Sequence, residues 1–452
     1  MWTDRGGSPI INRLNSKESQ NAGGKMAAVS PFRGWRFNQD TVGDMASVLC
    51  PPYDMIDEET QEALKRQNQY NVIHLEAGEG LDWNTSAKEQ YTAASNLFDQ
   101  WRKEEVLRQD TEPCYYLMRH SFPLGGKIMV RVGLIASVGL EDYQTRQILP
   151  HEFTQAPAIQ DRVWLMESLS ANISPIMSIF RDAEGVLAQV FEQVMTATPE
   201  FDATDDSDNG TALWRISDPA VHVQISEFFA SRPVYLADGH HRYEAARQYQ
   251  LDRHAESEAA TAPNLAHNHV MMTLIAFDDP GLVVLGYHRT LNGVPADKLG
   301  RIKSKLNELF DSAPLSGNSD ALIEQVDEQG VNTQLLAAVD SDGARMLRLK
   351  ESAVDPSWGS LSASEAWVLE EQVLRPELGD ATLDHLDFMH DHDEAVEQAR
   401  KGELQMTFLL KPFPLDAFES IVGGGQRLPR KSTFFFPKLP TGLVINRLEG
   451  EL

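Results

Sequence analysis

The residues with the clearest chemical potential form one short segment, Asp238-Gly239-His240-His241-Arg242. An apolar stretch before the segment predicts a strand, the glycine predicts a tight turn, and the following pattern predicts a helix from about His240. The first amides of a helix have no partner within it and favour an anion, and Arg242 could bind a phosphate bidentately. The segment therefore predicts a phosphate site. The alternative is that Asp238 only caps the helix while the histidines pack inside.

A second group could move a proton. His151 and Glu152 are followed by the hydroxyl of Thr154, and Asp161 and Arg162 come a few residues later. A histidine beside a carboxylate can act as a general base, a metal ligand or a hydrogen-bonding group for a substrate. The zinc-protease pattern HExxH is excluded because its second histidine is absent. Asp161 and Arg162 open a predicted helix, where they could equally be a cap and a surface charge.

Two more polar clusters lie beside apolar segments. His288 and Arg289 end a predicted strand and could face the same pocket. In a chain of strongly negative charge, a cationic cluster near the C-terminus is a candidate contact for an acidic ligand. Its alternative role is a solvated loop beside a core strand. The cluster consists of Arg427, Arg430, Lys431 and Lys438, together with the hydroxyls of Ser432 and Thr433.

Three histidines among four aspartates, in the segment 384–393, raise the question of a metal site. A metal needs three or four converging ligands, and the same spacing is typical of a strand followed by an Asp-capped helix. The metal assignment therefore stays unknown. The acidic segment 202–210 lacks the ligand spacing of a calcium loop and predicts an exposed turn. The sequence contains no P-loop, no GxSxG elbow and no Rossmann glycine pattern after a strand.

Strand and helix patterns alternate from Phe32 to the C-terminus, and these elements must position the polar groups. Asp57 is a predicted N-cap, Thr85 can cap a long amphipathic helix, and a Lys/Glu-rich helix is predicted from about Ala296 to Phe310. This alternation predicts an α+β fold of mixed sheets with flanking helices, arranged in two lobes.

The expected domain organisation has three parts. Residues 1–25 are polar and rich in Gly, Ser and Asn, which predicts a disordered leader, and Met26 is the expected native start. An N-terminal lobe is expected over residues 26–293, with the first two clusters. A C-terminal α+β lobe is expected over residues 294–452, with the Lys-Ser-Thr segment.

Composition limits the classes of function. The 452 residues carry 40 Lys and Arg against 67 Asp and Glu, which gives a net charge of −27. Such a chain repels phosphate backbones, which excludes sequence-independent nucleic-acid binding as a main role. Two cysteines cannot form a disulfide framework. No apolar run approaches the ~20 residues that span a bilayer, and the first residues lack a secretory signal. We therefore expect a soluble cytoplasmic protein with no nucleic-acid or membrane partner.

Several further motifs occur in order between about residues 28 and 446. They are Pro31-Phe32-Arg33-Gly34-Trp35-Arg36, Pro51-Pro52-Tyr53-Asp54, Tyr70-Asn71-Val72-Ile73, Asp279-Pro280-Gly281-Leu282 and Pro437-Lys438-Leu439. Together with the clusters above, this set resembles a bacterial and archaeal family catalogued as domain of unknown function 1015. The sequence departs from the family at Gly286-Tyr287 and at Leu428, where the family usually has Pro-Thr and Met.

The turn at Gly239 is also similar to the phosphate-binding turn of ParB and sulfiredoxin-like proteins. That superfamily includes nucleotide-dependent free-serine kinases and CTP-binding partition proteins. The resemblance implies the same kind of anion site that the helix N-terminus predicts independently.

These observations lead to the hypothesis of a phosphate- or nucleotide-handling enzyme, most concretely a small-molecule phosphotransferase. Glu152 or Asp238 would be the base, with His151 in the catalytic set. Mg²⁺ would accompany the nucleotide. The residues expected to bind phosphate or neutralise its charge are Gly239, His240, His241, Arg242, Arg162, His288, Arg289, Lys431, Ser432 and Thr433.

Two alternatives stay open at this point. One is a non-catalytic nucleotide sensor that uses the same turn. The other is a metal-dependent hydrolase built on His151, Glu152 and the histidines near residue 390. The expected partner is a phosphorylated small molecule or a nucleotide, and the sequence does not determine the oligomeric state.

Overall fold

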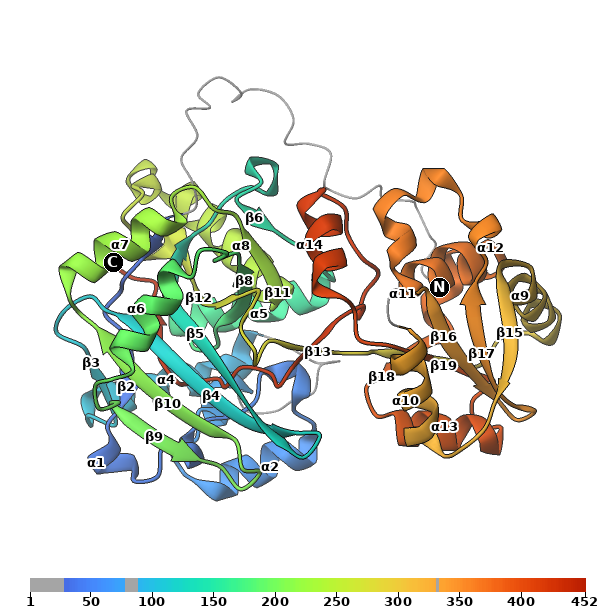
Figure 1. Cartoon of the computed structure of the whole chain (residues 1–452). Coiled ribbons are helices and arrows are strands. Elements are labelled where there is room, and N and C mark those ends of the chain that lie inside the picture. The colour runs from blue at the N-terminus through green and yellow to red at the C-terminus, as the bar shows by residue number, and fades with distance from the viewer. Residues whose placement is uncertain (1–27, 78–87, 331–332) are drawn as a thin grey trace, which may run out of the picture.

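The computed structural model describes residues 28–77, 88–330 and 333–452. The predicted leader over residues 1–25 and the predicted cap at Thr85 lie outside these ranges. The described chain forms two lobes, each built around its own sheet (Figure 1). The α+β class and the two-lobed arrangement are therefore confirmed. Among the described helices, none has the length and apolar character needed to cross a bilayer.

The first lobe is built on a mixed sheet. β8 pairs with β11 in antiparallel orientation and with β12 in parallel orientation. β4 and β5 form a hairpin around Gly125-Gly126. The strands run in the order β6 (Ile148–Leu149), β11 (Val234–Asp238), β8 (Ile176–Phe180), β12 (His269–Ala276), β5 (Lys127–Gly139), β4 (Tyr115–Leu124), β10 (Gly210–Ile216) and β9 (Phe201–Thr204), and β1 (Val29–Ser30) pairs with β5.

Both faces of this sheet are buried. Tyr115 and Leu117 of β4 belong to one core, and Tyr116 and Met118 belong to the other. This alternation follows from the two-residue period of a strand. The first core is covered by α6 (Val186–Val194), α7 (Pro219–Phe229) and α8 (His240–Glu256), and the second by α4 (Tyr91–Lys103) and the C-terminal segment. The sheet therefore fixes the position of the turn at Gly239, which follows β11.

The second lobe is built on an antiparallel sheet. Helix α9 (Ala296–Leu309) packs in the core of one face, while α10 (Ser319–Gln329) and α13 (His392–Lys401) pack in the core of the other. The strands run in the order β15 (Phe310–Leu315), β17 (Gly343–Leu349), β16 (Leu335–Asp340), β19 (Met406–Leu410), β14 (His288–Leu291) and β18 (Leu386–Met389).

After β19 the chain returns to the first lobe, as the red ribbon in Figure 1 shows. Helix α14 (Leu415–Gly423) places Phe418 and Ile421 in the core of the first lobe. The strand β20 (Phe434–Phe436) pairs with β13 (Val283–Leu285), and β21 (Asn446–Arg447) pairs with β7 (Ala171–Asn172). The boundary near residue 293 stays a prediction, but α14, β20 and β21 do not remain with the predicted C-terminal lobe over residues 294–452.

One predicted helix cap is confirmed, and one predicted helix start is wrong. Asp57 accepts a hydrogen bond from the amide of Thr60 at 2.8 Å and caps α2 (Glu58–Gln67), as predicted. The predicted start of a helix at Asp161 is wrong, because α5 spans Ala156–Leu169 with a proline in its first turn. Proline is favoured in the first turn of a helix, where its missing N–H costs nothing. Asp161 and Arg162 therefore lie in the middle of α5 rather than at its cap.

Candidate functional site

The strand, turn and helix predicted around Gly239 are present. Gly239 has a φ of +93°, and a Cβ added there would lie 2.9 Å from Nε of Arg242, so both backbone and space favour glycine. The first intrahelical bond of α8 runs from the amide of Tyr243 to the carbonyl of Gly239 at 3.0 Å. No described side chain caps the helix. The amides of His240, His241 and Arg242 are therefore free to receive an acceptor.

Asp238 is held between two cations and does not act as the cap. Its carboxylate accepts from Nη2 of Arg242 at 2.7 Å and from Nζ of Lys438. Burial alone would raise the pKa of Asp238, but the charges of Lys438 and Arg242 outweigh it and hold the pKa below its usual value. An ionised carboxylate in two ion pairs is a weak base, so Asp238 serves to hold the turn.

Arg242 is also occupied. Its Nη1 donates to Oγ of Ser174 at 2.6 Å and to the carbonyl of Pro175, while Nη2 binds Asp238. These bonds connect the first turn of α8 to the segment before β8. Its Nε has no partner but is buried, so the guanidinium offers no exposed pair of donors for the bidentate phosphate contact that the sequence predicts, and it supports the turn instead.

The two histidines His151 and His240 form a buried pair. His151 donates from Nδ1 to the carbonyl of Leu236 at 2.7 Å, so its Nε2 accepts from the hydroxyl of Thr433 at 3.0 Å. Nε2 of His240 accepts from the amide of His151 at 3.2 Å. Burial lowers the pKa of His151 to about 4. Both rings are therefore neutral near pH 7, and both nitrogens of His151 are used in holding the site together.

Glu152 approaches the site from the loop after β6. Its Oε1 accepts from the amide of Lys431 at 3.2 Å, and burial raises the pKa of Glu152. Lys431, whose amide makes this bond, has a φ of +55°, in the left-handed region. Nearby, Nε2 of His241 accepts from the amide of Gln155 at 3.1 Å. A half-buried carboxylate of raised pKa is a stronger base than one held by ion pairs.

These groups surround a cavity of about 130 Å³ at the N-terminus of α8. Lys431 keeps its charge there: burial would lower its pKa, but Tyr287 and the carboxylates of Asp54 and Glu152 outweigh burial and raise it. Arg430 and Lys431 form no ion pair with any described residue, in contrast to Arg242 and Lys438. The lining consists of Tyr53, Asp54, Glu152, Phe153, Asp238, Gly239, His240, His241, Arg242, Arg430 and Lys431.

The model of the family described as protein of unknown function (DUF1015) matches residues 29–364. The chain belongs to this family. No curated protein matches it. Three solved structures share 11–13% sequence identity with this DUF1015 member. A conserved hypothetical protein from Pyrococcus furiosus aligns with a TM-score of 0.34 over 65% of this chain and 90% of its own.

The other two solved structures align at a similar level. A free serine kinase in complex with AMP has a TM-score of 0.34 over 67% of this chain and 88% of its own. A C-terminally truncated SbnI from Staphylococcus aureus has a TM-score of 0.35 over 70% and 87%.

Arg162 lies behind the cavity rather than in its lining. It donates to Glu76 at 2.8 Å, to Asp161 from Nε at 2.8 Å and to the hydroxyl of Tyr91 at 2.9 Å. Its guanidinium stacks over the ring of Tyr53, 4.2 Å from the ring centroid. All of these contacts are with other residues of the fold. Arg162 therefore supports Tyr53 and does not line the cavity.

Arg289 lies in the second lobe and holds the loop that carries the two free cations. It pairs with Glu370 at 3.0 Å and donates to the carbonyls of Lys431 at 3.0 Å and Arg430 at 3.1 Å. Ser432 bonds within the same loop, to the carbonyl of Pro429. Arg289, Ser432 and Thr433 therefore position the loop, and none of them lines the cavity.

His288 is buried at the start of β14, outside the cavity. Its Nδ1 accepts from the amide of Leu410 at 3.3 Å. Burial, with added repulsion from His392 and Arg289, lowers the pKa of His288 to about 3. The ring is therefore neutral and structural in the folded protein.

This neutral ring predicts acid sensitivity. Below the unfolded pKa of about 6.5, the unfolded chain binds a proton at His288 before the folded chain does. As the pH falls from about 6.5 toward the folded pKa, this histidine should therefore lower the free energy of unfolding by about 1.4 kcal/mol per pH unit. Asn in place of His288 keeps an acceptor for Leu410 and does not titrate. Urea unfolding at pH 7, 6 and 5 should show a shallower loss for His288→Asn; equal slopes would contradict the prediction.

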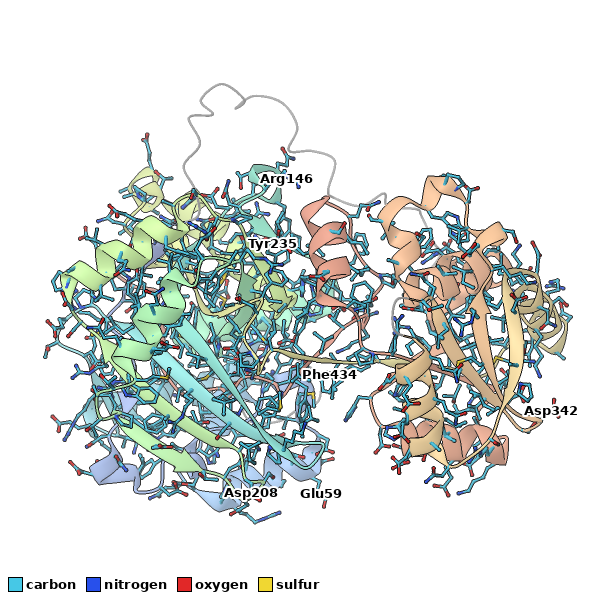
Figure 2. All side chains as sticks on the ribbon, in the orientation of Figure 1. Glu59, Arg146, Asp208, Tyr235, Asp342 and Phe434 are labelled. Atoms are coloured by element: carbon cyan, nitrogen blue, oxygen red, sulfur yellow. The ribbon has the colours of Figure 1, made fainter. Side chains whose placement is uncertain are left out.

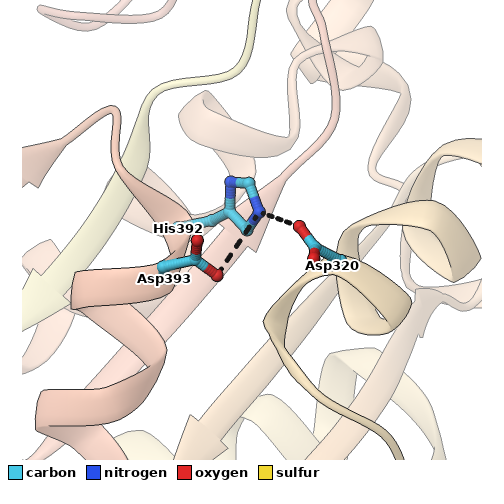
Figure 3. A group of neighbouring side chains, drawn as sticks. All are labelled: Asp320, His392 and Asp393. Atoms are coloured by element: carbon cyan, nitrogen blue, oxygen red, sulfur yellow. Dashed lines mark hydrogen bonds and ion pairs between the residues drawn. The ribbon is translucent and has the colours of Figure 1, made fainter. Parts of the chain in front are cut away.

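The predicted histidine and aspartate segment yields one group with metal-ligand spacing among the described residues. Nε2 of His392 lies 3.1 Å from Asp320 and 3.8 Å from Asp393 (Figure 3). Both carboxylates are exposed. His385 and His390 do not belong to this group. His151 bonds within the first lobe, so it does not join the histidines near residue 390 as the metal-hydrolase hypothesis required.

Sequence reasoning missed part of the lining. Tyr53 and Asp54 belong to a family motif with no predicted role, and Phe153 has no predicted role either. Arg430 was singled out only as part of a cationic cluster. The motif Pro51-Pro52-Tyr53-Asp54, which has no other predicted role, was the available signal.

Proposed function

We propose that this protein handles a phosphorylated small molecule or a nucleotide, most concretely as a small-molecule phosphotransferase. One observation carries the proposal: the uncapped amide end of α8 opens into the same cavity as Arg430 and Lys431. Neither cation has an ion pair with a described residue, in a chain of net charge −27. Free amides, a helix dipole and two unpaired cations are the donors that a phosphate requires.

The proposed phosphate contacts keep the helix amides and Lys431 from the predicted set and add Arg430. The amides of His240, His241 and Arg242 donate to the phosphate oxygens, and the side chains of Arg430 and Lys431 neutralise the charge of the phosphate. Asp238 and the Arg242 guanidinium hold the turn. The finer resemblance of this turn to ParB and sulfiredoxin-like proteins stays a prediction.

Glu152 is the proposed general base. Burial raises the pKa of its carboxylate, and it lines the same cavity as the helix amides. In a transfer to a hydroxyl, this carboxylate takes the hydroxyl proton as the oxygen attacks phosphorus, and the leaving phosphate departs with the bonding electron pair. Asp54 and Glu152 together supply carboxylate oxygens, the ligands that Mg²⁺ prefers, and Mg²⁺ would enter with the phosphates.

Phosphate binding is tested by removing the two cations. The Arg430→Ala/Lys431→Ala variant should lose the rise in melting temperature that ATP, ADP, CTP, GTP or inorganic phosphate, each with and without Mg²⁺, gives the wild type. A weakening of at least about tenfold is expected for the affected ligand, because two charge-assisted contacts are lost. Lys401→Ala, which removes an exposed cation on α13, is the matched control and should bind as the wild type does.

The proposal fails if no phosphate compound binds the wild type, or if the double variant binds as tightly. Catalysis has a separate test. Glu152→Gln keeps an acceptor for the amide of Lys431 but cannot take a proton, so it should retain binding and lose nucleotide consumption with a panel of hydroxyl acceptors. If the wild type binds but consumes no nucleotide with any acceptor, the non-catalytic sensor is the better description.

A further inference from the structure

A larger cavity, of about 420 Å³, adjoins the phosphate cavity across Lys438. Lys438 lines it, and the ammonium of Lys438 binds Asp238 of the smaller cavity. Its volume falls within the range of sites for small organic ligands. α2 and the β9–β10 turn form one side, where Figure 2 places Glu59 and Asp208 at the same edge of the first lobe. The lining is mainly apolar and includes Leu49, Met55, Leu64, Ala203, Phe434 and Phe436.

One buried polar group faces this apolar cavity. His120 is 4% exposed, and its Nδ1 lies 3.0 Å from Nη2 of Arg131. A guanidinium can only donate, so Nδ1 accepts and Nε2 carries the hydrogen. Burial and the charge of Arg131 lower the pKa of His120 to about 3, which keeps the ring neutral. Nε2 has no partner in the described chain and is not sealed off, so its N–H is a free donor in the cavity wall.

The cation beside the His120 donor is Arg131, whose environment is unusual for a buried charge. Arg131 is fully buried and donates to the carbonyls of Phe436 and Pro437 and to His120. It forms no ion pair with any residue in the described ranges, and its Nε has no partner. The acid whose charge acts on it, Asp279, is bound to the amides of Val132 and Gly281. A buried cation without a carboxylate is costly, and an anion against His120 would offset that cost.

We propose that this cavity binds a small organic acid. The carboxylate accepts from Nε2 of His120, which Arg131 polarises from behind, and the apolar body packs against Met55 and Phe436. Acidic groups at the rim do not occupy the donor, because the carboxylate of Asp205 is bound to the amides of Ser207 and Asn209. The inference does not rest on the proposed phosphotransfer, since none of these groups takes part in the proposed phosphate binding.

The test compares acids with their amides. Phenylacetate and octanoate are titrated into the full-length protein by calorimetry, beside phenylacetamide and octanamide, without phosphate or nucleotide. At least one acid should bind, and its amide should bind at least about tenfold more weakly. His120→Phe should remove the preference for the acid. Ala203→Phe should block both compounds, because its new ring fills the cavity.

The control is Ala313→Phe, the same change at an exposed position of β15 in the other lobe, and it should bind as the wild type does. The proposal is overturned if no acid binds, if acid and amide bind equally, or if Ala203→Phe binds as tightly as the wild type. If His120→Phe does not fold, the Ala203→Phe result and the acid–amide comparison decide. Loss of phosphate binding at α8 would leave this result unchanged, so the two proposals fail separately.

Discussion

Replacing Arg162 by methionine should lower the free energy of unfolding by about 3–5 kcal/mol, the cost of breaking a buried ion pair on one side. Arg162 is the cation that compensates the buried carboxylates of Glu76 and Asp161. Methionine approximates the length of the side chain but leaves both carboxylates without a counter-charge. Urea unfolding at pH 7, followed by circular dichroism, measures the loss.

Two further measurements separate this charge effect from lost packing. Adding Glu76→Gln to Arg162→Met should restore part of the stability, because one uncompensated charge is then removed. Burial raises the pKa of Glu76 already in the wild type. The folded variant should therefore bind protons more readily than its unfolded chain, and the loss should shrink from pH 7 to pH 5. A loss that is the same at both pH values would show that packing dominates.

Replacing Arg289 by methionine should have two effects at once. The free energy of unfolding of the second lobe should fall by about 3–5 kcal/mol, because Glu370 keeps a buried charge without its partner. Phosphate binding should also weaken, because the loop loses the donors to the carbonyls of Arg430 and Lys431. The fluorescence of Trp358 and Trp367, which pack on this core, follows unfolding, and calorimetry with ADP follows binding.

Glu370→Gln is the matched variant for Arg289→Met. It also breaks the buried charge pair, so stability should fall, but Arg289 can still donate to the two carbonyls and binding should persist. Weakened ADP binding in Arg289→Met but not in Glu370→Gln would establish Arg289 as a positioning residue for the loop. Equal binding in the wild type and Arg289→Met would contradict that role.

The sequence was a sufficient guide where a feature depends on neighbouring residues. Asp57 caps α2 because a side chain and an amide three residues apart meet whatever surrounds them. The strand, the glycine turn and the helix around Gly239 follow from local patterning in the same way. The start of α5 was misplaced because Asp161 resembles a cap when its partners are unknown, whereas those partners, Arg162 and Tyr91, make it a buried acceptor.

The sequence by itself thus determined the α+β class, the family motifs and the anion-favouring turn at Gly239. Only the tertiary structure decided which groups are free to act there. Asp238 and Lys438 are 200 residues apart, and Glu152 and Lys431 are 279 apart. Bonds to Ser174, Pro175 and Asp238 occupy the terminal nitrogens of Arg242, and no described residue forms an ion pair with Arg430 or Lys431. The two cations at Asp238 leave Glu152 as the better base. Such pairings depend on how whole sheets and the returning C-terminal segment pack, which local periodicity does not encode.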